Sequence, residues 1–116
     1  MNLTQIELKI KENQYIIETI EQLEKDFLLS GINLIISKPI KSYDFLFHVL
    51  LDQLYILNKK KITELLYRVD LSEEFIRSQI TKSSAGFLEL ISELIIKRVL
   101  YKVILKKQIE TKNLNY

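Results

Sequence analysis

The scarcity of helix-breaking residues constrains this sequence more than any other feature. Only two glycines and one proline occur in 116 residues, and no segment alternates apolar and polar residues between turn signals. Glycine and proline are the residues that most often interrupt regular structure, so a chain this poor in them favours long helices. We therefore predict an all-α fold, a bundle of about five helices with long first and last helices and a buried central helix.

The length predicts a single helical domain over residues 1–116, with a frayed C-terminal tail at 111–116. Twenty leucines and 18 isoleucines are available for the core. The first ten residues already carry charges, and no uncharged run is long enough to cross a bilayer. The absence of cysteine fits a reducing compartment and excludes thiolate chemistry. We therefore expect a soluble protein of the cytoplasm.

Local signals divide the chain into its helices. Thr4 and Glu7 have the spacing of a capping box at the first helix, and Gly31 is suited to end it in a left-handed conformation. Asp70 and Glu73 repeat the capping spacing, and Ser83 or Ser84 is the expected cap of the last helix. Between the first two helices lies a crossover at 32–41, interrupted by a proline. The expected helices cover residues 4–30, 42–58, 60–69, 71–80 and 84–110.

The first expected helix carries a regular apolar stripe with alternating steps of four and three residues. Its positions are Ile6, Ile10, Asn13, Ile17, Ile20, Glu24 and Phe27. This spacing is typical of helices that pair along a narrow seam. It suits either packing inside the chain's own bundle or pairing between subunits, where Asn13 would fix the register.

The second expected helix is apolar nearly all round, which is typical of a helix buried on most sides. We predict that it is the central helix. The last helix differs, because its apolar face changes direction along its length. The apolar residues of its first half lie on one side of the helix, and those of its second half lie on nearly the opposite side. We therefore predict that the second half meets another copy of the chain. The expected interface residues are Ile96, Leu100, Val103 and Ile104, with Arg98 and Lys102 beside them.

Residues that could support catalysis are few. The single histidine, His48, has Asp44 and Asp52 four residues to either side, so the three form one strip on the second helix. One histidine without cysteine gives neither a transition-metal site nor a nucleophilic triad, and two isolated glycines make no phosphate loop. We expect a solvated polar strip here, no enzymatic activity, no metal and no cofactor.

Charge is unevenly distributed along the chain. Residues 1–58 sum to −3 and residues 59–116 to +5. The basic half could face an acidic protein partner or nucleic acid. The candidates for nucleic-acid contact are Lys59, Lys60, Lys61, Arg77, Arg98, Lys102 and Lys106.

The segment 62–80 resembles a helix-turn-helix, the DNA-binding motif whose second helix reads the major groove. It departs from that motif at the crowded position Leu66, at the turn residue Asp70 and at Gln79. Two glutamates also begin the would-be reading helix, where they would meet the phosphate potential. We therefore predict a small non-catalytic interaction or assembly protein, a homodimer joined through its first and last helices. The alternative is a helix-turn-helix-like DNA- or RNA-binding regulator.

Overall fold

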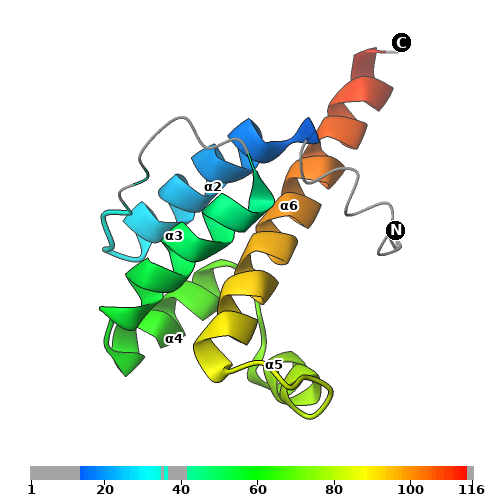
Figure 1. Cartoon of the computed structure of the whole chain (residues 1–116). Helices are drawn as coiled ribbons and strands as arrows, with labels where there is room; N and C mark the ends of the chain where they lie inside the picture. Colours follow the sequence, from blue (N-terminus) through cyan, green and yellow to red (C-terminus); the bar gives the residue numbers. More distant parts are fainter. Residues whose placement is uncertain (1–13, 35, 37–41, 115–116) are drawn as a thin grey trace.

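The computed structural model describes residues 14–34, 36 and 42–114, with side chains up to residue 111. Within this part of the chain the structure consists of five α-helices and no strand. They are labelled in Figure 1 as α2 (Ile16–Leu29), α3 (Tyr43–Tyr55), α4 (Lys59–Arg68), α5 (Glu73–Ile80) and α6 (Phe87–Leu114). The predicted all-α bundle of about five helices is confirmed for these residues. No described helix is both long enough and apolar enough to cross a membrane.

Short polar side chains begin three of the helices. Ser42, Asn58 and Ser72 each accept a hydrogen bond from the backbone N–H three residues later, at 3.2, 2.9 and 3.2 Å. These bonds satisfy N–H groups that have no partner inside the helix. The prediction that Asp70 caps α5 was therefore wrong, because Ser72 does so.

The boundaries of α6 also differ from those predicted. The helix begins at Phe87, later than the serines expected to cap it, and Ser83 instead accepts a bond from Ala85 N–H at 3.0 Å. It continues past residue 110 and includes residues up to Leu114, the last one described.

The C-terminal ends of α2 and α4 share one backbone motif. After α2, Gly31 has φ +77°, Gly31 N–H donates to Leu28 O at 3.0 Å, and Ile32 N–H donates to Phe27 O at 2.8 Å. This is the Schellman motif, in which a left-handed residue lets the chain turn back on the helix end. The predicted role of Gly31 is confirmed. Beyond it, Ile32 is buried, as expected for a crossover held on the core.

The most enclosed helix is α6. Both α2 and α3 pack along it, and α5 lies beside its first turns (Figure 1). Its buried residues point in several directions, since neighbouring helices cover more than one side. This explains the rotating apolar face seen in the sequence without a second chain. The central helix is therefore α6, and the prediction that the second helix occupies that place was wrong.

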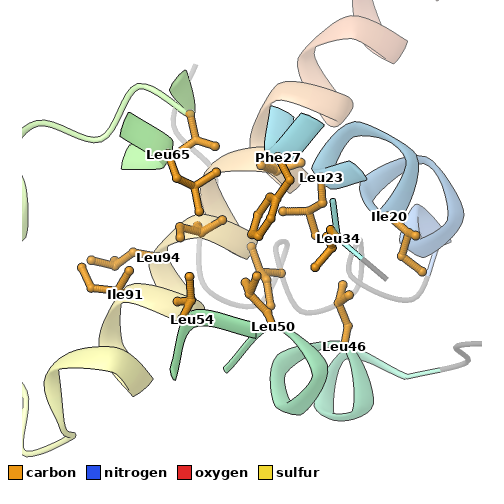
Figure 2. Close-up of a cluster of buried hydrophobic side chains, with 14 of the residues drawn as sticks. Ile20, Leu23, Phe27, Leu34, Leu46, Leu50, Leu54, Leu65, Ile91 and Leu94 are labelled. Atoms are coloured by element: carbon orange, nitrogen blue, oxygen red, sulfur yellow. The ribbon is translucent and has the colours of Figure 1, made fainter. Parts of the chain in front are cut away.

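Helix α3 fully buries one stripe, and Tyr43, Phe47 and Val49 pack partly buried beside it. Leu46, Leu50 and Leu54, four residues apart, point into the core from α3 (Figure 2). Phe45 and Ile56 are exposed, although the sequence has apolar residues on nearly every side of this helix. Because apolar residues lie on nearly every side of α3, the sequence did not show which side packs against the core.

Helix α2 packs through a face that overlaps the predicted stripe in part. Ile20 and Phe27 of the stripe are buried, together with Ile16 and Leu23 beside it, whereas Ile17 of the stripe is exposed. The buried residues follow the α-helical period around Leu23, so the helix packs within the chain's own core. The earlier members of the stripe, including Asn13, lie outside the described residues.

Candidate functional site

The four apolar residues expected at a subunit interface lie in the interior of the single chain. Ile96, Leu100, Val103 and Ile104 are only 1, 1, 7 and 1% exposed. Ile96 and Leu100 line a small internal hollow together with residues of α2 and α3. A second copy could reach these side chains only if the helices separated first.

The two charged residues placed beside that interface are held by the chain itself. Arg98 Nη2 lies 2.9 Å from Asp70 Oδ2, at the corner between α4 and α5. Lys102 lines a hollow between α2 and α6 together with Glu18 and Glu21. The same acids are near Lys106, so α2 places negative charge beside this part of α6.

The other cations proposed for nucleic-acid contact are scattered over different helices. Lys61 Nζ donates to Ser30 O at 3.2 Å and lies 3.3 Å from Glu64. It thus brings a positive charge to the C-terminal end of α2, which has no basic residue in its own last turn. Arg77 lies 3.5 Å from Glu73. Phosphate contact by Lys61 or Arg77 would require these ion pairs to break, whereas Lys59 and Lys60 are exposed at the start of α4.

The Asp44–His48–Asp52 strip lies on the outer side of α3, where all three residues are exposed. Among the described residues, no group of three or more histidine or carboxylate side chains is arranged to hold a metal. At the end of α3, the Tyr55 hydroxyl donates to Glu89 Oε1 at 3.2 Å. This hydrogen bond and the charge of the carboxylate raise the pKa of Tyr55 above its ordinary value of 10.0.

An open apolar pocket lies between α4, α5 and the first turn of α6. Its volume is about 540 Å³. We call it the α4–α5–α6 pocket, and its lining residues are Lys59, Ile62, Thr63, Leu66, Glu73, Ile76, Arg77, Ile80, Phe87 and Leu88. The six apolar side chains come from all three helices, and the three charged ones come from α4 and α5.

The pocket has more apolar side chains than two other hollows of the described surface. The hollow between α2 and α6 has Val103 as its one apolar side chain, among charged residues and a glutamine. The hollow between α2 and α4 has two large apolar or aromatic side chains, Leu29 and Tyr67. The α4–α5–α6 pocket has six, and two of them, Ile80 and Phe87, are 42% and 52% exposed. Large apolar side chains gathered at a concave surface are typical of interaction sites.

The corner between α4 and α5 sets the shape of this pocket. Asp70 N–H donates to Tyr67 O at 3.1 Å, and Leu71 N–H donates to Leu66 O at 2.9 Å. This is the second Schellman motif of the chain, and Asp70 has φ +66° where glycine is usual. The ion pair with Arg98 connects this corner to α6.

The left-handed conformation of Asp70 leads to a stability prediction. We expect Asp70→Ala to lower the free energy of unfolding by about 1–2 kcal/mol, since the exposed ion pair is lost and alanine adopts the left-handed conformation less readily than aspartate. Asp70→Gly removes the same pair but also the strain, so its stability should stay within about 1 kcal/mol of the original. Urea denaturation of both variants measures the difference. Equal losses in the two variants would show that the backbone conformation contributes nothing.

The α4–α5–α6 pocket was not identified from the sequence. Most of its lining residues belong to the segment 62–80, which resembles a helix-turn-helix. In that motif Ile62, Leu66 and Ile76 would face the interior of the domain. Ile80 and Phe87, whose exposure marks the site, had no distinguishing local pattern. Comparison of the chain with protein-family models, with curated proteins and with solved structures finds no match.

Proposed function

We propose that this chain is a small non-catalytic interaction or assembly protein, and that it binds a polypeptide through the α4–α5–α6 pocket. The observation that carries the proposal is the exposure of Ile80 and Phe87 around a concave apolar surface. Covering apolar surface contributes roughly 25 cal/mol per Å² to binding. This replaces the interface expected on the last helix, whose residues are buried. A cytoplasmic location remains part of the proposal, on the ground that the chain has no cysteine.

A polypeptide suits this pocket better than a small polar ligand. Sites for small molecules combine an apolar wall with a few polar groups that converge on the ligand. Here Thr63 supplies the one uncharged polar side chain of the lining, and the charged groups of Lys59, Glu73 and Arg77 are exposed to solvent. Exposed charges contribute little to holding a small ligand, whereas an apolar helix or loop is bound through the six apolar side chains of the lining.

Site-specific photo-cross-linking tests this proposal. A tagged chain carrying photo-reactive benzoyl-phenylalanine at position 87 is irradiated in a lysate of its own organism. We expect a covalent adduct with a polypeptide, because the ring at this position lies in the pocket. The same amino acid at position 67 is the matched control, since Tyr67 is an aromatic side chain 85% exposed on α4 and outside the pocket lining. The absence of a polypeptide adduct from position 87, or equal labelling from position 67, would contradict the proposal.

A further inference from the structure

We propose that the polypeptide bound in the α4–α5–α6 pocket is a second copy of this chain, related to the first by a two-fold axis. The inference rests on the proposed function and names its partner. It is carried by the charges on the two walls of the pocket, which have opposite signs at the N-terminal ends of their helices.

The wall formed by α4 is basic. Lys59 lines the pocket, Lys60 follows it, and both are exposed. The first turn of α4 contains no acidic residue. Cations are unfavourable at this end of a helix, because the aligned peptide dipoles already make it positive. Lys61 is compensated by Ser30 and Glu64, but no ion pair within the described part of the chain involves Lys59 or Lys60.

The wall formed by α5 begins with acids. Glu73 lines the pocket, Glu74 follows it, and both are exposed in the first turn of the helix. The ion pair between Glu73 and Arg77 is highly exposed, with side chains 82% and 77% accessible, and so holds Glu73 only weakly. Glu73 is therefore free to pair with a cation from outside the molecule.

Two-fold symmetry explains why both signs occur around one pocket. In such a contact each surface patch meets a copy of itself, so a patch of a single sign would repel its partner. Here the basic α4 wall of one copy can face the acidic α5 wall of the other, with Lys59 opposite Glu73 twice. The same contact covers Ile80 and Phe87 of both copies and supplies the lysines of α4 with carboxylates.

Sedimentation of the purified full chain tests the apolar part of this contact. We expect a dimer, and we expect Phe87→Asp to weaken its dissociation constant by about 100-fold or more, since the change acts twice per dimer. Aspartate is tolerated in the first turn of a helix, so this variant should remain folded. The matched control is Ile17→Asp, also in the first turn of its helix, 65% exposed and outside the pocket lining. The control should leave the dissociation constant unchanged.

Charge reversal tests the pairing itself. Lys59→Glu and Glu73→Lys should each weaken the dimer by about tenfold at low salt, and the double variant should restore most of the affinity. Failure of the double variant to recover, with both single variants folded by circular dichroism, would overturn the assigned pairing.

The two proposals fail in distinguishable ways. A purified chain that stays monomeric at several hundred micromolar and low salt overturns the second-copy assignment. If position 87 still cross-links to a different polypeptide in the lysate, the interaction function stands without it. An adduct of twice the chain's own mass supports both.

Discussion

Replacing Leu100 by aspartate is expected to unfold the chain rather than to release a folded monomer. Leu100 is 1% exposed and lines an internal hollow with Ile16 and Leu46. An unpaired charge at such a position costs about 3–5 kcal/mol, in addition to the lost packing. Small domains have free energies of unfolding of about 5–15 kcal/mol, so this one change removes most of the stability.

Circular dichroism and urea denaturation measure the effect of this change. The matched control is Ile109→Asp on the same helix, where the side chain is 60% exposed and the expected loss is below about 1 kcal/mol. The sequence alone predicted the opposite outcome, because Leu100 and Ile104 were placed at a dimer interface, where replacing both by aspartate would give a folded monomer. Recovery of a folded monomer from a dimeric parent would restore that interpretation and place the interface on α6.

Replacing Phe27 by alanine is expected to lower the free energy of unfolding by about 3–5 kcal/mol. The ring is fully buried where α2 meets α3 and α6, among leucines of three helices (Figure 2). Its removal leaves a cavity that the surrounding helices cannot fill without losing their own contacts. The urea midpoint should fall while the dependence of stability on urea concentration is unchanged.

The neighbouring residue provides the control. Leu28 is 68% exposed, so Leu28→Ala should change stability by less than about 0.5 kcal/mol. Phe27 and Leu28 belong to the same helical turn. A difference in stability between the two variants is therefore due to burial and not to position in the sequence. Equal losses in the two variants would contradict the packing of α2 described here.

Helix formation followed from the sequence because its signals are local. Ser42 accepts a bond from a backbone group three residues away, and the bonds around Gly31 span no more than five residues. Such signals act before any helix meets another, so they can be read from the residues in order. They predicted the two helices that begin near residues 42 and 60, and the end of the first.

The candidate site was not predictable in the same way. Its apolar walls come from α4, α5 and α6, and only their relative placement turns Ile62, Ile80 and Phe87 into one surface. Two residues of its rim, Lys59 and Arg77, had been selected from the sequence as basic groups for nucleic acid. Their charge was evident, but Glu73, which lines the same pocket on α5, became relevant only once the pocket was known.

The sequence by itself determined that this chain is helical, where α3 and α4 begin, and that Gly31 ends α2. Only the tertiary structure decided that α6, and not α3, is the enclosed helix, because burial depends on which neighbours a helix has. It also decided that Arg98 lies beside Asp70, the left-handed residue that ends α4. Arg98 Nη2 donates a hydrogen bond to Asp70 Oδ2 from 28 residues later in the chain. A contact between residues so distant in sequence forms only after the helices have packed, so it could not be predicted from a local pattern.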